Sequence, residues 1–302
     1  MAESKYHVII DPKYGYKRLE PLPSGSELAK FYESQYYDLI KKGGRVPELR
    51  RIMAGGDEAC HEISWLEQVL YSDIEYLLKK YAPGKRIMDV GCGTGELIGF
   101  LENKGFETMG IEPSFYAVAV ATQKGINAQQ ATLEEYFDSW SFENNHKHHS
   151  ITLINVLEHV PNPVSIIDLL KRVLEPDGLI LIRVPNEFND LQLAAQKKFD
   201  CPPWWVAIPD HINYFNLHTL SHMLDMLGFE TIYSQSDFPM EVFLLMGDNY
   251  IGNPEVGSIC HQKRVNFEMS ISDDLRRKIY HALAEVGIGR DIMVLAKKKS
   301  YT

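Results

Sequence analysis

The chain has 302 residues, of which 45% are hydrophobic, and its formal net charge is −10. This length is sufficient for a large domain with a full hydrophobic core, and the ordinary charged and glycine fractions argue against disorder. Because no long Lys/Arg stripe is present, the sequence disfavours a nucleic-acid binder, whose affinity would depend on basic side chains.

Three features of the sequence indicate where in the cell the protein is expected: its amino end, its apolar runs and its cysteines. The amino end lacks the basic-then-apolar build of a secretory signal, and no apolar run approaches the length of a membrane span. The four cysteines are far apart and show no CxxC spacing, which disfavours a zinc knuckle or a redox pair. We therefore expect a reduced, soluble, cytoplasmic protein with no membrane partner. The sequence leaves homodimer formation open.

The first 80 residues are predicted to be helical after an irregular start. Residues 1 to about 27 are rich in Tyr, Pro and Lys and are interpreted as an irregular lead-in. A first helix is expected from Ser26 through Leu39, and Gly43 and Gly44 after it are expected to stop the helix. Apolar residues at helical spacing predict a second helix from Cys60 to Tyr81.

From about residue 85 the chain alternates between short apolar strands and helices. The predicted strands are Ile87–Val90, Phe106–Ile111, Ile126–Gln129, Ile151–Asn155, Leu179–Val184, Phe229–Gln235 and Ile292–Ala296. The predicted helices are Glu96–Asn103, Phe115–Gln123, Pro163–Val173 and Leu217–Leu227. This alternation favours an α/β fold with a doubly wound, mostly parallel sheet. The histidine-rich run 146–149 is interpreted as a solvated loop before the fourth strand.

Two segments interrupt the alternation and carry helical periodicity with aromatic residues. We interpret them as caps around the mouth of the sheet rather than as separate domains. The predicted organisation is an N-terminal helical cap over residues 1–80, an α/β core over 81–237, a helical cap insertion over 238–287, and the final core strand and tail over 288–302.

A glycine-rich turn follows the first core strand, in the run Asp89-Val90-Gly91-Cys92-Gly93-Thr94-Gly95. Glycine permits positive φ and lets a ligand touch the backbone without a Cβ in the way. Ligands of such sheets bind beyond the carboxyl ends of the strands. Three alternate glycines behind an acidic strand end therefore predict a cofactor site rather than a merely tight turn.

The residues around this turn indicate which cofactor it takes. The dinucleotide fingerprint places its third glycine three positions after its second, where this chain has Glu96. An anionic side chain on the first turn of a helix would repel a pyrophosphate. A zwitterionic sulfonium cofactor meets no such objection, and Glu112, at the end of the second strand, can accept hydrogen bonds from two ribose hydroxyls.

At these residues the chain resembles the class I S-adenosylmethionine-dependent methyltransferases, and in particular their quinone and small-molecule O-methyltransferase branch. The resemblance covers about half of the chain, roughly residues 80 to 237 with the last strand. It is carried by Val90-Gly91-Cys92-Gly93-Thr94-Gly95, Glu112-Pro113-Ser114, Asn155-Val156-Leu157-Glu158-His159-Val160-Pro161-Asn162-Pro163, Leu174-Glu175-Pro176-Asp177-Gly178 and Pro185-Asn186.

The resemblance implies a seven-stranded, Rossmann-like sheet whose last strand is antiparallel and inserted beside the fifth. It also implies S-adenosyl-L-methionine as cofactor and S-adenosyl-L-homocysteine as product. The residues that match the cofactor positions are Asp89, Gly91, Cys92, Gly93, Gly95, Glu112, Pro113, Ala131, Thr132 and Asn155.

Two histidines are candidates for catalysis. A base is needed only when the acceptor carries a proton that must leave, as a hydroxyl does. His159 is expected to face the cofactor at the end of the fourth strand, although it could equally cap a helix or bond a loop carbonyl. His211 follows the fifth strand in a loop that should lie over the carboxyl end of the sheet.

A metal is not expected, although Glu158-His159 resembles part of the metal site in quinone O-methyltransferases. In that site a Glu three positions before the Glu-His pair completes the ligands, and this chain has Asn155 there. Asn is a poor substitute for a carboxylate on a hard cation. We instead expect the Asn155 side chain to touch the cofactor.

Four residues are candidates for contact with the acceptor. Trp204 and Trp205 form an aromatic, proline-stiffened stretch that could wall the acceptor site or pack as core. Tyr214 lies near His211 in the same loop. Arg264, which shares a helical face with His261 and Glu268, could hold an anionic acceptor, although a surface ion pair accounts for it more simply.

The sequence therefore favours a methyltransferase that acts on a small molecule, with oxygen slightly favoured over nitrogen as the acceptor atom. Two alternatives stay open. A protein that binds the cofactor without turnover could serve as a regulatory or scaffold subunit. A nicotinamide-dependent oxidoreductase is disfavoured by Glu96 and by the late position of the glycine turn.

Overall fold

The structure is a computed structural model that describes residues 5–34, 50–52, 55–139 and 147–299. The strands are β1 (His7–Ile10), β2 (Lys17–Glu20), β3 (Arg86–Val90), β4 (Glu107–Glu112), β5 (Ala128–Gln130), β6 (His148–Ile154), β7 (Leu174–Pro185), β8 (Asn213–Tyr214), β9 (Phe229–Ser236) and β10 (Asp291–Lys298). The helices are α1 (Gly25–Ser34), α4 (Gly56–Leu66), the π-helix η1 (Glu67–Tyr71), α5 (Ser72–Tyr81), α6 (Glu96–Asn103), α7 (Phe115–Gln123), α8 (Leu133–Ser139), α9 (Pro163–Val173), α10 (Asp190–Phe199), α11 (Leu217–Met226), α12 (Glu241–Met246), α13 (Pro254–Ser270) and α14 (Asp273–Glu285).

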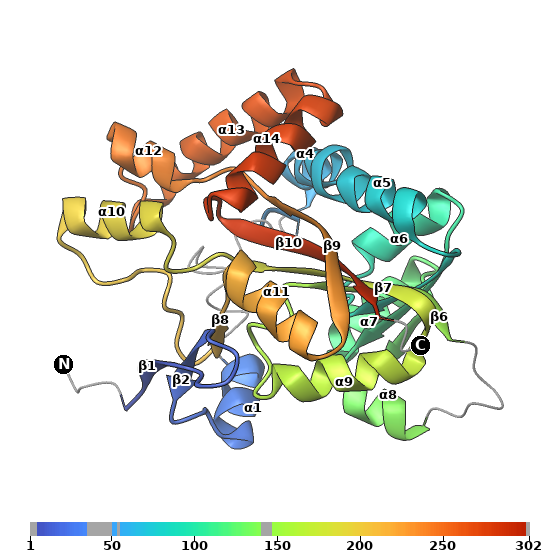
Figure 1. The fold of residues 1–302 in the computed structure, drawn as a ribbon. Helices are drawn as coiled ribbons and strands as arrows, with labels where there is room; N and C mark the ends of the chain where they lie inside the picture. The colour runs from blue at the N-terminus through green and yellow to red at the C-terminus, as the bar shows by residue number, and fades with distance from the viewer. Residues whose placement is uncertain (1–4, 35–49, 53–54, 140–146, 300–302) are drawn as a thin grey trace.

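The central sheet has seven strands in the order β5-β4-β3-β6-β7-β10-β9. The pairs from β5 to β7 are parallel, whereas β10 runs antiparallel to both β7 and β9. The predicted doubly wound sheet, with its last strand antiparallel beside the fifth core strand, is therefore confirmed. Figure 1 shows β10 lying between β7 and β9.

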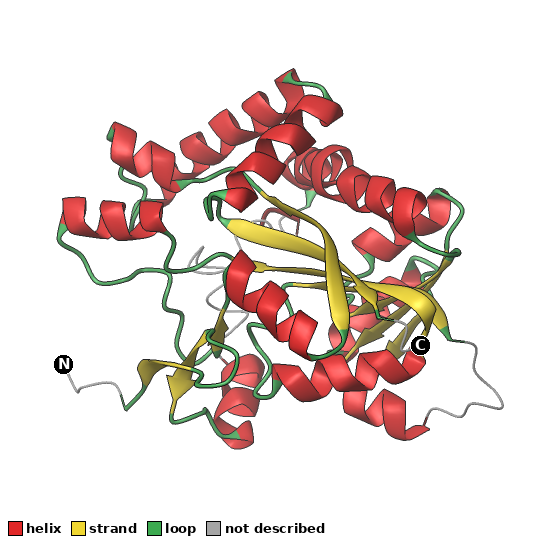
Figure 2. Ribbon diagram, in the orientation of Figure 1, coloured by secondary structure: helices red, strands yellow, loops and turns green. Residues whose placement is uncertain are grey.

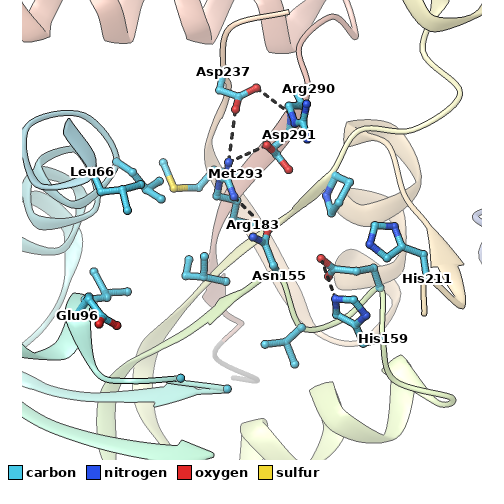
Figure 3. A pocket seen from close by; sticks show the side chains of 18 of the residues that line it. Leu66, Glu96, Asn155, His159, Arg183, His211, Asp237, Arg290, Asp291 and Met293 are labelled. Carbon is cyan, nitrogen blue, oxygen red and sulfur yellow. Dashed lines mark hydrogen bonds and ion pairs between the residues drawn. The ribbon is translucent and has the colours of Figure 1, made fainter. Parts of the chain in front are cut away.

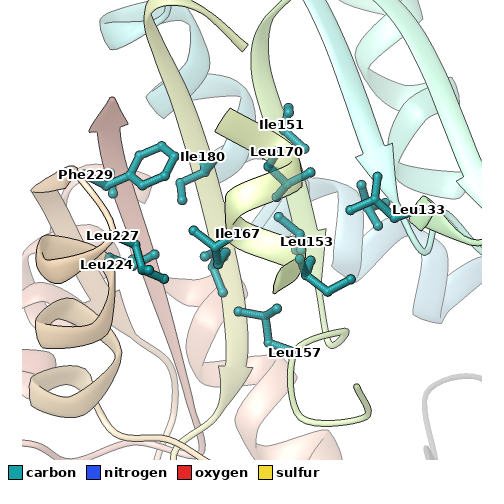
Figure 4. Packing of buried hydrophobic residues seen from close by; sticks show 14 of the residues in the cluster. Leu133, Ile151, Leu153, Leu157, Ile167, Leu170, Ile180, Leu224, Leu227 and Phe229 are labelled. Atoms are coloured by element: carbon teal, nitrogen blue, oxygen red, sulfur yellow. The ribbon is translucent and has the colours of Figure 1, made fainter. Parts of the chain in front are cut away.

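Helices cover both faces of this sheet, as Figure 2 shows. Ile180 and Ile182 of β7 belong to the cluster packed under α9 and α11, part of which Figure 4 shows. The intervening Leu179 and Leu181 belong to the cluster under α5 and α6. Successive side chains of a strand point to opposite faces, so a strand buried on both faces must be apolar throughout. The run Leu179–Ile182 has this composition because both of its faces are covered.

The amino-terminal segment differs from the predicted irregular lead-in. Its strands β1 and β2 pair antiparallel, and β2 also pairs with β8. Leu19 is fully buried in this small sheet, and Tyr16 packs on Phe215 at 4.9 Å between ring centroids. Strands of four residues give too short a pattern for recognition when their partner lies about 200 residues away. The predicted first helix is present as α1 (Gly25–Ser34). Its predicted continuation to Leu39 lies outside the described residues.

The helices flanking the core meet one another. In Figure 1, α4 and α5 lie beside α13 and α14 on one side of the sheet. Trp65 on α4 donates a hydrogen bond to Glu268 on α13 at 2.7 Å, and Arg276 on α14 forms an ion pair with Asp73 on α5 at 3.0 Å. The predicted division into two caps and a core remains a prediction, but these helices form one layer.

Two further expectations concern the chain outside the site. His148 was expected in a solvated loop, yet it begins β6 and is buried. Burial lowers the pKa of His148 to about 4, so this imidazole is neutral. Among the described residues, no helix is long and apolar enough to cross a membrane.

Candidate active site

A large cavity opens where the parallel strands end. Within the described part of the chain it measures about 1960 Å³ and is lined by residues that follow β3, β4, β5, β6 and β7. Pockets for a single small ligand occupy roughly 300–1,000 Å³. The cavity therefore has room for a cofactor and a second molecule, at the edge where ligands of such sheets bind.

The glycine turn after β3 forms one wall of this cavity. Gly93 has a φ of 54°, and a Cβ placed on it would meet no atom within 4 Å. The space in front of this residue is therefore open to the cavity. A ligand can approach the backbone here because no side chain intervenes.

Glu112 connects the ends of two neighbouring strands. One carboxylate oxygen accepts a hydrogen bond from the Gly93 backbone N–H at 3.1 Å, and the other accepts one from Ser114 at 2.8 Å. Burial raises the pKa of Glu112, although both hydrogen bonds oppose the shift. The remaining lone pairs of this carboxylate, which lines the cavity, can accept hydrogen bonds from a diol.

Two more carboxylates flank the turn, and their pKa values shift in opposite directions. Burial raises the pKa of Asp89 to about 7, while a hydrogen bond from Thr152 at 2.5 Å opposes this shift. Burial would also raise the pKa of Glu96, but Lys124 at 2.8 Å and Thr94 at 2.6 Å outweigh it and the pKa is lowered. Glu96 therefore stays ionised in the cavity wall, beside the positive end of α6.

Asn155, at the end of β6, is held by an arginine. It has a φ of 56°, and its side-chain oxygen accepts a hydrogen bond from Arg183 at 3.0 Å. Figure 3 shows Arg183 between Asn155 on one side and Asp237 and Asp291 on the other. Arg183 forms ion pairs with Asp291 at 2.7 Å and with Asp237 at 3.4 Å.

This charge network continues into α13. Arg264 is buried and forms ion pairs with Asp237 at 3.0 Å and with Glu268 at 3.2 Å. Burial would raise the pKa of Asp237, but Arg264 and Arg183 outweigh it, so the pKa is lowered. Burial beside Asp237 raises the pKa of Asp291. Arg264 and Arg183 are thus engaged by carboxylates of the protein itself.

His159 is held by two acids. Its Nδ1 lies 3.1 Å from a carboxylate oxygen of Asp210, and its Nε2 lies 3.7 Å from Glu158. Burial would lower the pKa of His159, but Glu158 and Asp210 outweigh it and raise the pKa to about 9. The ring is therefore an imidazolium at neutral pH and has no lone pair to accept a proton.

His211 lies against His159 in an edge-on arrangement, with ring centroids 5.0 Å apart. Its Nδ1 lies 3.0 Å from a carboxylate oxygen of Glu187, a buried residue just after β7. A carboxylate at Nδ1 favours the tautomer that carries its proton there. The Nε2 lone pair is then the proton acceptor that His211 offers to the cavity.

Glu158 and the two histidines also bear on whether this site could bind a metal ion. Glu158, His159 and His211 each offer one ligand atom, and these atoms lie within 4.8 Å of one another. Nitrogen and carboxylate ligands together suit zinc or another transition metal better than magnesium. The position that would carry the third ligand of the quinone O-methyltransferase site is Asn155, whose oxygen is engaged by Arg183. The absence of a metal remains a prediction.

Aromatic side chains form part of the cavity wall beyond the histidines. Trp204 and Trp205 both line the cavity, with their rings edge-on at 4.7 Å between centroids. Trp205 is buried and also packs edge-on against Phe188 at 5.6 Å. The inner Trp205 thus combines the core and wall positions that the sequence offered as alternatives.

The family of the chain follows from residues 63–234, which match the family model described as a methyltransferase domain. This segment is more than half of the chain and contains the glycine turn, Glu112 and the two histidines. The chain belongs to the methyltransferase domain family. The resemblance inferred from the motifs is confirmed.

Curated relatives of this chain include ubiquinone biosynthesis O-methyltransferases. The protein of that name from Glaesserella parasuis serovar 5 is 38% identical over 109 residues, which are 34% of this chain and 46% of the relative. The one from Alkalilimnicola ehrlichii is 33% identical over 109 residues, covering 34% and 42%. The chain thus spans less than half the length of these relatives.

Solved structures agree with the fold of this chain. A SAM-dependent methyltransferase from Archaeoglobus fulgidus has a TM-score of 0.51 at 17% identity, covering 87% of this chain and all of that one. The plantazolicin methyltransferase BpumL, solved in complex with SAH, also has a TM-score of 0.51, at 15% identity over 90% of this chain and 94% of its own. At these identities the likeness concerns the fold alone.

Most of the expected site residues line the large cavity described above. They include the two candidate bases, both tryptophans, Arg264 and, from the cofactor set, Asp89, Gly91, Cys92, Gly93, Glu112, Pro113, Ala131, Thr132 and Asn155. The structure brings these residues together from the ends of five strands and from α13. Their individual roles remain predictions.

The structure places three of the expected residues differently from the expectation. Gly95 is not among the cavity-lining residues; a Cβ there would meet Ile126 and Ala121 at 3.1 and 3.3 Å, so this glycine permits close packing of α6. Tyr214 lies buried in β8 against Phe188 and not in the cavity wall. The interpretation of Arg264 as part of a surface ion pair is wrong, because its guanidinium is buried between Asp237 and Glu268.

Sequence reasoning missed several charged residues of the cavity, among them Arg183, Glu187, Asp237 and Glu241. Glu187 had a usable signal, because it follows the fifth core strand directly and polar residues at such ends gather at the ligand site. Arg183 and Asp237 form a pair across two strands distant in sequence. Only the order of β7, β10 and β9 shows that they meet.

Proposed function

We propose that this protein transfers a methyl group from S-adenosyl-L-methionine to a small-molecule acceptor. The observation that carries the proposal is the cradle formed by Gly93 and Glu112. An open backbone position faces a cavity there, and a carboxylate that bridges two strand ends lies within hydrogen-bond distance of its N–H. A backbone without a side chain and a carboxylate acceptor fit an uncharged nucleoside with two ribose hydroxyls.

When bound, the cofactor supplies a methyl group on a sulfonium, whose thioether leaves without help. The tasks left to the chain are binding, alignment and, for an acceptor that loses a proton, removal of that proton. Glu112 would hold the ribose. The ionised Glu96, which lines the same cavity, is suited to an ammonium group such as that of the methionine part.

We assign the two histidines different roles. His211 is the proposed base, because Glu187 orients its ring and leaves Nε2 as the acceptor nitrogen. His159 is a positioning residue, since it is protonated by virtue of Glu158 and Asp210 and lies against the His211 ring. A base of this kind favours a hydroxyl as methyl acceptor, in keeping with the O-methyltransferase names of the curated relatives.

The two alternatives make different demands on the site. A nicotinamide cofactor would place a pyrophosphate near the start of α6, where Glu96 is ionised. A scaffold protein without turnover would not need a base, yet His211 lies in the cavity with a dedicated carboxylate. Location in the cytoplasm and homodimer formation stay predictions from the sequence.

Calorimetric titration with S-adenosyl-L-homocysteine tests the proposal. We expect binding to the wild type and a loss of at least about tenfold in affinity for Glu112→Ala, because charge-assisted hydrogen bonds to the ribose would disappear. Glu107→Ala is the matched control, since this exposed residue begins the same strand. Thermal unfolding of both variants reports on their folding.

The result that would overturn the proposal is tight binding of NADH without binding of S-adenosyl-L-homocysteine. The titration is repeated after treatment with a chelator, which we expect to leave the affinity unchanged. Loss of binding that returns on addition of zinc or magnesium would contradict the predicted absence of a metal.

A further inference from the structure

On the basis of the proposed function, we infer that the methyl acceptor carries a cationic nitrogen, and that Glu187 and Glu241 bind it against an aromatic wall. The inference concerns the part of the cavity beyond the histidines, which the cofactor cradle leaves to the acceptor. It specifies the substrate class: a small molecule that carries an ammonium group as well as the atom that accepts the methyl group.

Glu187 is buried, and one of its two carboxylate oxygens lies 3.0 Å from His211. The other oxygen has no hydrogen-bond partner among the described residues. Burying a carboxylate oxygen in this way is unfavourable unless a hydrogen-bond donor or a cation pairs with it. Because Glu187 lines the cavity, a ligand can supply that donor.

The loop that carries Glu187 is held in place on both sides. The Asn186 side chain donates hydrogen bonds to the carbonyls of Gly287 and Gly289 at 3.0 and 3.1 Å. Phe188 adopts a φ of 63°, which is uncommon for an aromatic residue, and packs edge-on against Trp205. Glu187 therefore cannot swing away to find another partner without disturbing these contacts.

Glu241, at the start of α12, repeats the pattern of Glu187. It is buried, it lines the cavity, and one of its oxygens lacks a partner among the residues described. Gln192 connects Glu241 to the loop that carries Glu187: its side chain hydrogen-bonds with Glu241, and its oxygen accepts a hydrogen bond from the Phe188 backbone N–H at 2.6 Å.

Aromatic rings complete a surface suited to a cation. Trp204 and Tyr250 line the same cavity as the two acids. Burial raises the pKa of Tyr250, and Glu241 adds to the shift, which places the phenol within the field of that carboxylate. Faces of Trp and Tyr attract ammonium groups through the ring quadrupole, most strongly where water is excluded.

Two arginines of the cavity wall are already engaged by other acids. Arg183 and Arg264 are engaged by Asp237, Asp291 and Glu268. Arg290 acts on Glu241 at longer range, but burial prevails and raises the pKa of Glu241. A bound cation would pair with this acid and oppose the effect of burial on its pKa.

The test uses the protein loaded with S-adenosyl-L-homocysteine and three phenols of similar size. Tyramine carries an ammonium group, 4-ethylphenol is neutral, and 3-(4-hydroxyphenyl)propionate is an anion. We expect calorimetry to show tyramine binding about tenfold or more tighter than 4-ethylphenol, with the anion weakest. Glu187→Gln and Glu241→Gln should each remove most of this difference, whereas the exposed Glu230→Gln should retain it.

The possible failures are distinguishable. If S-adenosyl-L-homocysteine does not bind, the proposed function is wrong. If it binds, and 4-ethylphenol then binds as tightly as tyramine, the inference of a cationic acceptor is wrong while the proposed function stands. Failure of tyramine to bind at millimolar concentration, or a difference that survives in both glutamine variants, would equally overturn the inference.

Discussion

At the scale of single residues, neighbouring acids give two adjacent imidazoles opposite chemistry. Glu158 and Asp210 raise the pKa of His159 to about 9, against the effect of burial. His211 has one carboxylate partner, Glu187, at Nδ1. An imidazolium can donate but cannot accept a proton, so His159 is not suited to general-base catalysis at neutral pH, and His211 is the remaining candidate of this pair.

We predict that His211→Gln lowers kcat by about 100-fold or more, the usual contribution of a positioned base, with little change in cofactor affinity. His159→Gln should cost less, because this residue orients its neighbour rather than accepting a proton. The measurement is the rate of S-adenosyl-L-homocysteine release with an acceptor that the enzyme uses. His222→Gln, on the exposed face of α11, is the control. A larger loss for His159→Gln than for His211→Gln would reverse the assignment.

At the scale of elements, the site is built from strand ends joined by short polar contacts. The turn after β3 and the end of β4 meet through Glu112 and Gly93, while Asn155 after β6 meets Arg183 of β7. The π-helix η1 interrupts the helix between α4 and α5, and its residues Val69, Leu70 and Tyr71 line the cavity. Such insertions are frequent at functional sites.

The glycine turn allows a test that separates binding from backbone strain. Gly93 and Gly125 both have positive φ, at 54° and 80°, and a Cβ on either would meet no atom within 4 Å. We expect Gly93→Ala and Gly125→Ala to destabilise the fold by a similar amount, about 1 kcal/mol each. Only Gly93→Ala should weaken S-adenosyl-L-homocysteine binding, by about tenfold or more, because only Gly93 faces the cavity. Equal affinities of the two variants in calorimetry would contradict this role.

At the scale of the whole molecule, buried ion pairs join helices that are far apart in sequence. Arg276 on α14 pairs with Asp73 on α5, and both side chains are nearly inaccessible, at 2% and 1% exposure. Arg264 and Glu268 of α13 similarly meet Asp237 and Trp65. These contacts hold together α4, α5, α13 and α14, which form one layer and contribute residues to the cavity wall.

Breaking one such pair should therefore destabilise the whole fold. Arg276→Met leaves Asp73 buried beside the less buried Arg277, and we expect a loss of about 3 kcal/mol in the free energy of unfolding. Lys278→Met on the same helix removes an exposed pair with Asp274 and should change stability by less than about 0.5 kcal/mol. Denaturant unfolding of both variants provides the comparison. Similar values would show that the buried pair adds no stability.

The sequence by itself determined the α/β core and the cofactor end of the site. The signals for Pro163–Val173 and for the turn from Asp89 to Gly95 are local, because periodicity, caps and glycines act within a few residues. Glu112 could be assigned because every strand of a parallel sheet ends at the same edge. For these features, position along the chain already fixes position in space.

Only the tertiary structure decided which charges meet, and therefore what the acceptor half of the cavity offers. Arg264 looked like a surface residue until α13 was placed against Asp237, and Tyr214 looked like a wall residue until β8 paired with β2. Of the two acids that raise the pKa of His159, Glu158 is its neighbour in sequence, but Asp210 lies 51 residues away. Charge pairing and burial arise from contacts between distant segments, and no local pattern encodes them.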